Sequence, residues 1–377
     1  MDLPFDLGGG TASLGHRFLI GLQPGHVLGD HDKRLLSLLR PAGVVFFRAN
    51  FMADAPYDEW LGAHRELMAG IREYIGRDEV LFGIDHEGGG VLRPPAPITA
   101  YAYARRWKEQ AAAVGGAMGR ELASLGFNVN FAPVLDVNSN PDNPVIGQRA
   151  FGATPSEVTA AARPFLSAMQ AEGVLGCLKH FPGHGDTSVD SHYGLPAVDV
   201  DAETFRTREL APFRDLARGE ARMVMTAHIV FPQIDPGTPA TMSKTILQDI
   251  LRGELGFEGV VVSDDLGMKA ISSMLDRPET SIRLANAGCD LLCMCAYWAD
   301  TALILRIVEQ IVDGVREGKV MEKTLAASHR RIAALLKDAP QHAVRSLPEE
   351  TFAHHATLAP LRDNSPRKIS EGGAATV

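Results

Sequence analysis

The stretch KHFPGHGDTSVDSH, residues 179–192, places three histidines, two aspartates and a lysine in one short segment broken by glycines. Within it, Asp190 stands two residues before His192. An aspartate so placed can accept the imidazole N–H, fix the tautomer of the ring and stabilise the imidazolium. Imidazole, with an ordinary pKa of ~6.5, can both give and take a proton at neutral pH. Asp190 and His192 are therefore candidates for an acid/base pair, although an isolated D-x-H in a loop also arises by chance.

Metal binding is the alternative chemistry for the same segment. His180, His184 and His192 could supply ligands, together with Asp186 or Asp190. Their spacing matches no common zinc motif such as H-E-x-x-H, and no cysteine or glutamate partner accompanies them. We therefore expect no metal and no cofactor, and we keep a metal-dependent hydrolase as an alternative of another class.

The elements that must position these residues are short apolar runs separated by helical patterns. Runs without strict alternation suit parallel strands that are buried on both faces. Eight strand-then-helix units predict the α/β class and a (β/α)8 TIM-type barrel. A doubly wound open sheet would need a glycine-rich dinucleotide loop after an early strand, and the GGG at 8–10 precedes any strand. The runs are FLIGL (18–22), GVVFF (43–47), VLFGID (80–85), FNVNFAPVLDV (127–137), VLGCLKH (174–180), RMVMTAH (222–228), GVVVSD (259–264) and CDLLCMC (289–295).

Helices are expected over 58–76, 105–126 and 300–315, where apolar residues recur at helical spacing. In the second of these, Gly126 can serve as the C-terminal cap. A further helix over 321–337 should pack on the outside of the barrel. The chain is thus predicted to hold one catalytic barrel, 1–337, and a C-terminal extension, 338–377, that is partly disordered.

Charged side chains fall at the C-terminal ends of these runs, where a barrel of this type carries its chemistry. Charged groups do not normally end buried strands by chance, because burying an unpaired charge is costly. Asp264 could attack an electrophilic carbon, and Asp265 is its rival for this role. The two cannot face the pocket equally, because successive strand residues point to opposite faces. We expect one polar pocket at the barrel mouth. The strand-end residues are Asp85, His86, Glu87, Asp136, Lys179, His180, His228, Asp264 and Asp265.

Composition narrows the class of protein. The 377 residues are 45% hydrophobic and 22% charged, as in ordinary globular proteins, and the net charge of −9 argues against a nucleic-acid binder. The start, MDLPFDLGGG, lacks the basic region of a signal peptide, and no run reaches the roughly 18 apolar residues of a membrane span. We expect a soluble, cytoplasmic protein with no nucleic-acid or membrane partner, and a monomer. Reduced, buried thiols are expected at Cys177, Cys289, Cys293 and Cys295.

Taken together, the motifs resemble glycoside hydrolase family 3, and in particular its β-N-acetylhexosaminidase branch. The resemblance runs from about residue 15 to 337, and GHG-x(4)-DSH followed by SDDLxM is its most specific part. The motifs, in order, are IDHEGG (84–89), FAPVLDV (131–137), IGQRAFG (146–152), KHFPGHGDTSVDSH (179–192), VMTAHIVFP (224–232) and VVSDDLGM (261–268).

The resemblance implies a role for individual residues. The first aspartate of SDDL, Asp264, would be the nucleophile, His192 the general acid/base and Asp190 the partner of that histidine. An aspartate can accept hydrogen bonds from sugar hydroxyl groups, and lysine or arginine can donate to hydroxyl and acetamido oxygens. The substrate-binding residues implied are Asp85, Arg93, Arg149, Lys179, His180 and Met268.

The activity implied is that of a retaining exo-β-N-acetylglucosaminidase. It would act through a covalent glycosyl-enzyme on a small carbohydrate, such as a muropeptide in peptidoglycan recycling or a chitin-type oligosaccharide. A phosphorylase using the same Asp/His site is the alternative, because a neutral acid/base does not repel phosphate. Intact Asp264, Asp190 and His192 argue against a non-catalytic sugar-binding barrel. Two departures from the family pattern bear on the substrate: Gly90 replaces an arginine, and Ala296 replaces an asparagine after Cys295.

Overall fold

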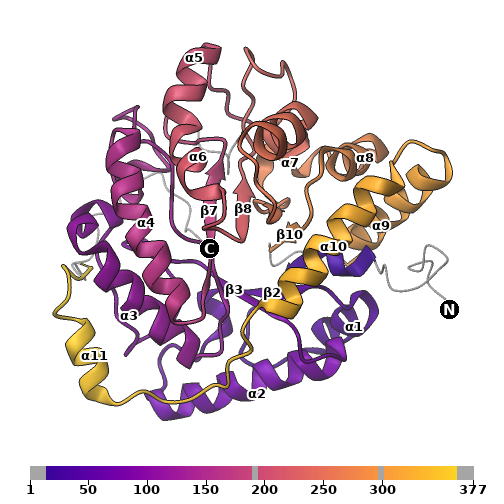
Figure 1. The fold of residues 1–377 in the computed structure, drawn as a ribbon. Coiled ribbons are helices and arrows are strands. Elements are labelled where there is room, and N and C mark those ends of the chain that lie inside the picture. Colours follow the sequence, from indigo (N-terminus) through magenta and orange to yellow (C-terminus); the bar gives the residue numbers. More distant parts are fainter. Residues whose placement is uncertain (1–13, 189–193, 296–300, 363–377) are drawn as a thin grey trace.

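The computed structural model describes residues 14–188, 194–295 and 301–362, and its centre is a barrel of eight parallel strands (Figure 1). Each strand lies within the apolar run that predicted it, apart from one residue at the end of β7. Their order around the sheet is β10-β1-β2-β3-β6-β7-β8-β9. The strands are β1 (Phe18–Gly21), β2 (Gly43–Phe46), β3 (Leu81–Ile84), β6 (Val129–Asn130), β7 (Leu175–Phe181), β8 (Met223–Thr226), β9 (Val260–Ser263) and β10 (Leu292–Met294).

Strand β10 closes the ring. It pairs with β1 over three residues, whereas the β9 side is joined by a parallel bridge from Val262 to Leu291, just before β10, and by a bond from Cys293 N to Ser263 Oγ (2.9 Å). Below this seam, the buried carboxylate of Asp290 accepts hydrogen bonds from Arg252 (2.8 Å) and Arg331 (2.7 Å). These ion pairs link the segment just before β10 to the segment before β9 and to α10 (Glu322–Asp338), beside the shortest strand pairing in the barrel.

Helices cover the outside of the strands (Figure 1). A π-helical segment, Thr245–Glu254, takes the helical position after β8. Between β3 and α3, β4 (His86–Gly88) and β5 (Val91–Leu92) form a two-stranded hairpin. The helices are α1 (Asp30–Leu39), α2 (Tyr57–Ile75), α3 (Ala111–Ser124), α4 (Pro155–Ala171), α5 (Ala202–Thr204), α6 (Ala211–Ala217), α7 (Lys269–Ser272), α8 (Pro278–Ala287), α9 (Thr301–Arg316), α10 (Glu322–Asp338) and α11 (Glu349–His355). Among the described residues, no helix combines the length and the apolar character that crossing a membrane requires.

Two elements differ from the sequence prediction. The helix expected over 105–126 begins only at Ala111, because the Trp107 backbone is not helical (φ −126°, ψ 18°) and its indole N–H donates to Ala102 O (2.7 Å). Gly126 does follow the helix with a positive φ of 88°, as a C-terminal cap requires. The strand expected over 127–137 is regular only at Val129–Asn130, since Pro133 has no N–H to continue the ladder.

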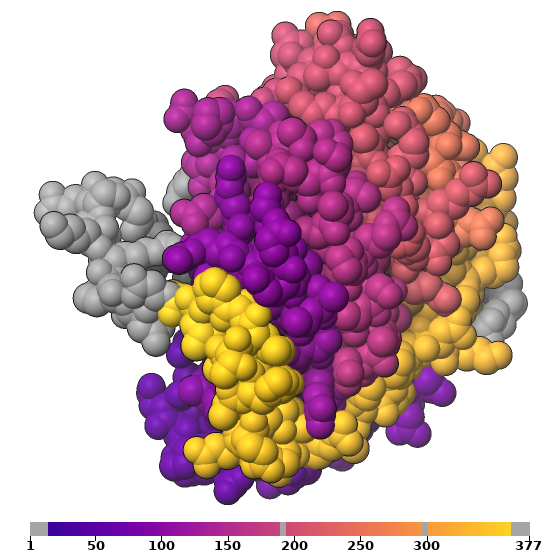
Figure 2. All heavy atoms as spheres, turned by 60° about the vertical axis from the view of Figure 1, so that its left-hand side comes forward, coloured from indigo at the N-terminus to yellow at the C-terminus, as the bar shows by residue number. Residues whose placement is uncertain are grey.

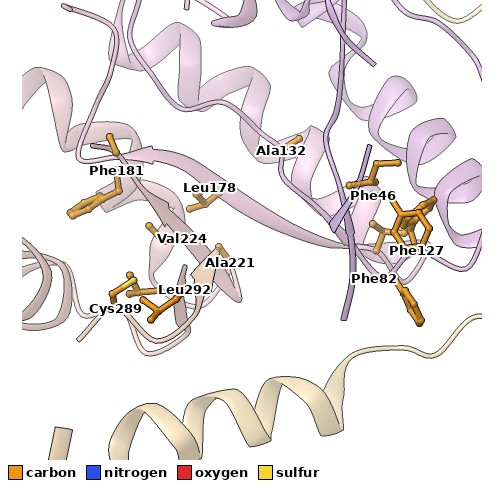
Figure 3. Close-up of a cluster of buried hydrophobic side chains, with 14 of the residues drawn as sticks. Phe46, Phe82, Phe127, Ala132, Leu178, Phe181, Ala221, Val224, Cys289 and Leu292 are labelled. Atoms are coloured by element: carbon orange, nitrogen blue, oxygen red, sulfur yellow. The ribbon is translucent and has the colours of Figure 1, made fainter. Parts of the chain in front are cut away.

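The apolar residues form two main layers, one inside the barrel and one between strands and helices. Figure 3 shows part of the outer layer, in which Phe46, Phe82 and Phe127 lie together behind the strands. Cys177, Cys293 and Cys295 belong to the inner layer, and all four cysteines are free and buried, as the sequence predicted.

After α10 the chain continues as a strap, residues 339–362, that crosses the outside of the barrel and contains α11. Figure 2 shows it in yellow, lying against the indigo and purple N-terminal part of the chain. The strap is bonded to the barrel along its length. Asn128 donates to Pro340 O (3.0 Å), His342 Nε2 lies 2.9 Å from Gly173 O, and Arg345 N donates to Ser124 O (2.8 Å).

A buried histidine in α2 predicts how stability depends on pH. His64 stacks on Phe51, with ring centroids 5.1 Å apart, and its Nε2 lies 2.8 Å from Leu125 O. Burial lowers the pKa of His64 to about 4. The folded state therefore binds this proton less tightly than the unfolded chain, so the stability present above pH ~6.5 is lost as the pH falls toward 4.

Between pH 6.5 and 4.5, the free energy of unfolding should fall by about 1–2 kcal/mol less in the His64→Gln variant than in wild type. The glutamine amide can still donate to Leu125 O but does not titrate. Urea denaturation at several pH values measures the difference. His354→Gln, at an exposed position of α11, is the control. Parallel stability curves for His64→Gln and wild type would contradict the prediction.

Candidate active site

The polar residues predicted at the strand ends meet at one end of the barrel. The eight strands of the barrel run parallel, so their C-terminal ends share one mouth. Asp85 follows β3, Lys179 and His180 lie within the last residues of β7, and Asp264 follows β9. Burial raises the pKa of the Cys177 thiol, which lies inside the barrel on β7; the charges of Asp85 and Asp264 raise this pKa further, whereas the charge of Lys179 lowers it. These three charged groups therefore stand around the same part of the barrel interior.

Lys179 is a buried cation held between two carboxylates. Its side chain is 3% exposed, and Nζ lies 2.8 Å from Asp85 Oδ1 and 2.5 Å from Glu87 Oε1. Burial alone would lower the pKa of Lys179, but the charges of Asp85 and Glu87 outweigh burial and raise it. The ammonium group remains protonated and fixed in direction, which suits a donor to a ligand oxygen.

Glu87 joins Lys179 to Arg149. The guanidinium of Arg149, from the short helix Gly147–Arg149, donates Nε to Glu87 Oε2 (2.9 Å) and Nη2 to Oε1 (2.8 Å). Burial alone would raise the pKa of Glu87, but Arg149 and Lys179 hold it well below its ordinary value. This carboxylate is thus saturated by two cations, and its role is to orient them rather than to accept from a ligand.

His180 is oriented by a second buried carboxylate. Its Nδ1 lies 2.6 Å from Asp136 Oδ2, and Asp136 Oδ1 also accepts from the backbone N–H of His184 (2.7 Å). Burial would raise the pKa of Asp136, but His180 and His184 lower it. His180 Nε2 lies 3.4 Å from Arg149 Nη2, which can only donate. The contacts therefore assign the proton to Nδ1 and leave Nε2 as an acceptor.

Asp85 and Arg93 lie at the open side of this network. Asp85 uses Oδ1 for Lys179, while Oδ2 lies 3.8 Å from Arg93 Nη2, and both side chains are about one-fifth exposed. The Arg93 guanidinium also lies over the Phe47 ring, 5.4 Å from its centroid. An accessible carboxylate beside two cations can accept from sugar hydroxyl groups while its neighbours donate to oxygens.

Asp264 and Asp265 have different surroundings. Asp265 Oδ1 accepts from Gly267 N and from Cys295 N, both at 2.9 Å, so it ties the end of β9 to the end of β10. Burial raises the pKa of Asp265. Both residues are partly buried, and Asp264 accepts the Asp265 N–H through Oδ1 at 2.8 Å. The structural bonds of Asp265 leave Asp264 as the better candidate for a group that reacts.

Among the described residues, the structure does not bring the predicted Met268 into this network through any side-chain bond. Met268 lies at the start of α7, nearly buried, and its N–H donates to Asp265 O (3.0 Å). Asp190 and His192 lie outside the described residues, so their roles stay predictions. The loop that leads to them is well supported: Asn143 Nδ2 donates to His184 O (2.8 Å) and lies 3.2 Å from Thr187 Oγ1.

Two residues have larger structural roles than the sequence suggested. Glu87 and Asp136 ended predicted strands but received no place among the site residues. Each is a buried carboxylate that orients cations or histidines which the sequence did predict. The available signal was the charge itself, because a carboxylate next to a buried strand needs a partner. The barrel mouth combines fixed cations, the accessible carboxylate of Asp85 and the separate carboxylate of Asp264, an arrangement suited to a polyhydroxylated ligand.

Comparisons with known proteins match this architecture. Residues 41–335 match the model described as "Glycosyl hydrolase family 3 N terminal domain". Beta-hexosaminidase A of Pseudoalteromonas piscicida is 37% identical over 331 residues, which cover 81% of this chain but 55% of that protein, so the chain spans about half the length of this relative.

Two solved structures extend the match to the fold. The family 3 β-N-acetylglucosaminidase of Paenibacillus sp. FPU-7 superposes with a TM-score of 0.80 at 33% identity, over 91% of this chain and 67% of that one. NagZ of Neisseria gonorrhoeae, solved in complex with N-trifluoroacetyl-D-glucosamine, gives 0.72 at 28% identity, over 91% and 98%.

Proposed function

The chain belongs to glycosyl hydrolase family 3, and from this premise we propose that it is a retaining exo-β-N-acetylglucosaminidase. The supporting observation is that a partly buried carboxylate, Asp264, stands at the same barrel mouth as the Lys179, Asp85, Glu87 and Arg149 network. The network can hold the hydroxyl and acetamido groups of one terminal sugar. Asp264 can then react with the carbon that carries the leaving group.

In the proposed reaction, Asp264 attacks the anomeric carbon and the glycosidic C–O bond breaks. His192 donates its proton to the leaving oxygen as a covalent glycosyl-enzyme forms. His192, now neutral, takes a proton from water as the water attacks the same carbon, which releases Asp264 and restores the starting states. Two displacements retain the anomeric configuration. Asp190 would hold the imidazole in the tautomer that each step needs.

The substrate proposed is a small carbohydrate with a terminal β-linked N-acetylglucosamine, from muropeptides or chitin-type oligosaccharides. The names of the matched relatives support the sugar, and the N-trifluoroacetyl-D-glucosamine bound to the Neisseria protein is a close analogue of it. A role in peptidoglycan recycling and a location in the cytoplasm complete the proposal.

An assay of released sugar tests the proposal. With 4-nitrophenyl β-N-acetylglucosaminide we expect turnover well above that of the matching β-glucoside, and NMR should show the β-anomer of the sugar first. The α-anomer as first product would contradict retention, and equal turnover of both glycosides would contradict the acetamido preference. Rate stimulation by phosphate with sugar-1-phosphate as product would indicate the phosphorylase alternative. Loss of activity on chelation would indicate the metal-dependent one.

A further inference from the structure

The C-terminal strap, residues 339–362, is bonded to a short segment that lies directly behind the substrate-binding hairpin. This segment, residues 99–103, precedes α3 and pairs with the end of the strap. Ala102 N donates to Pro360 O (2.9 Å), and Arg362 N donates to Ala100 O (2.7 Å). Between these bonds, Tyr101 and Leu361 form an antiparallel bridge. The strap therefore adds a short strand to residues 99–103.

Side chains reinforce this contact through a buried carboxylate. Glu121, fully buried in α3, accepts from Thr99 Oγ1 (2.6 Å) and Thr99 N (2.8 Å). Its Oε1 also lies 2.7 Å from Nδ1 of His355, at the end of α11. The Tyr101 hydroxyl donates to His355 O (2.9 Å). His355 is thus linked to residues 99–103 in two ways. Its carbonyl accepts directly from Tyr101, and its ring bonds to Glu121, which in turn accepts from Thr99.

The other side of residues 99–103 supports the turn of the β4–β5 hairpin. Gly89 N donates to Tyr101 O (2.8 Å). A methyl group on Gly88, where φ is +95°, would lie 2.4 Å from Ala102 O, and one on Gly89 would lie 2.2 Å from the Tyr103 ring. This close packing means that residues 99–103 cannot move without displacing the turn.

The hairpin carries the acidic half of the substrate-binding network. Glu87 lies in β4, beside Gly88 and close to the turn at residues 89–90, and orients Lys179 and Arg149. Asp85 directly precedes β4 and pairs with Lys179. A shift of the hairpin would therefore change the direction of both cations and weaken their hydrogen bonds to a bound substrate, because such bonds depend steeply on geometry.

We propose that His355 and Glu121 are positioning residues for substrate binding, through which the C-terminal strap holds the β4–β5 hairpin and its carboxylates in register with Lys179 and Arg149. The strap acts through residues 99–103 and does not itself touch the substrate. The kinetic part of the test rests on the proposed function, whereas the exchange measurement does not.

Hydrogen–deuterium exchange on the full-length protein tests the positioning directly. In His355→Ala we expect faster exchange of peptides that cover residues 84–94. His355→Asn should restore protection, because its amide nitrogen can occupy the place of Nδ1. His342→Ala is the matched control: it lies in the same strap, but its ring contacts Gly173 O, away from the hairpin. Tyr101→Phe, which removes one hydroxyl, gives a milder second variant should His355→Ala fail to fold.

Kinetics with the 4-nitrophenyl glycoside give the second measurement. We expect KM to rise about 10-fold in His355→Ala while kcat changes less than about 2-fold, since the strap affects binding groups and not Asp264. His342→Ala should leave KM unchanged. Unchanged exchange over 84–94 in folded His355→Ala and Tyr101→Phe would overturn the proposal, as would an equal change in His342→Ala. An inactive wild type would refute the proposed activity but leave the exchange test valid.

Discussion

Replacing Asp264 with alanine should reduce turnover of a 4-nitrophenyl β-N-acetylglucosaminide by roughly 10⁴-fold, with little change in KM. The side chain follows β9 at the barrel mouth and is only partly buried, so it can reach a ligand bound by Lys179 and Asp85. Its removal deletes the group proposed to form the covalent intermediate. Steady-state kinetics at saturating substrate measure the loss.

Asp265→Asn is the matched control for this prediction. The amide oxygen can still accept from Gly267 N and Cys295 N, so the junction between β9 and β10 should persist and turnover should fall only a few-fold. Azide gives a further check, because it can enter the space left in Asp264→Ala and attack from the same side, yielding a glycosyl azide of inverted configuration. Near-normal turnover in Asp264→Ala would remove Asp264 as the nucleophile.

His192→Ala should slow turnover by an amount that depends on the leaving group. General acid catalysis contributes about 10²–10⁴-fold, and it matters most when the departing oxygen is basic. We therefore expect a loss of that size for an alkyl N-acetylglucosaminide but a much smaller loss in the first step for a 4-nitrophenyl glycoside. A series of aryl glycosides measures the dependence as the slope of log(kcat/KM) against leaving-group pKa.

His184→Gln is the control within the same segment. In the structure its Nδ1 lies 2.8 Å from Thr187 Oγ1, so its replacement should affect the loop rather than proton transfer. The loss should then be similar for every leaving group. If the slope for His192→Ala equals that of wild type, His192 is not the general acid.

The strands and the location of the site could be predicted from the sequence because both follow from local patterns. Every apolar run that predicted a strand contains one, and the charges at the ends of β3, β7 and β9 meet because parallel strands share a C-terminal edge. Apolar residues at helical spacing likewise predicted a helix within 105–126, where α3 lies. They failed at its start, where an unpredictable bond from Trp107 to Ala102 O holds the chain out of the helix.

The partners of each charge could not be predicted, because they join residues far apart in the chain. Arg149 pairs with Glu87, 62 residues away, and Glu121 pairs with His355, 234 residues away. Polar composition predicted a partly disordered C-terminal extension over 338–377 but did not indicate which surface the extension covers. Its described part, up to residue 362, packs through His355 and Phe352, which are buried, and Leu361 forms an antiparallel bridge with Tyr101.

The closure of the barrel by β10 has a consequence for synthesis of the chain. Strand β1, Phe18–Gly21, finds its second neighbour only in Leu292–Met294, so residues 18–21 leave the ribosome long before the strand that pairs with them. Until then, β1 and β9 each present an unpaired edge that could join another nascent chain. Such long-range closure also slows folding. Chaperones that shield strand edges would act on this intermediate, before the seam exists.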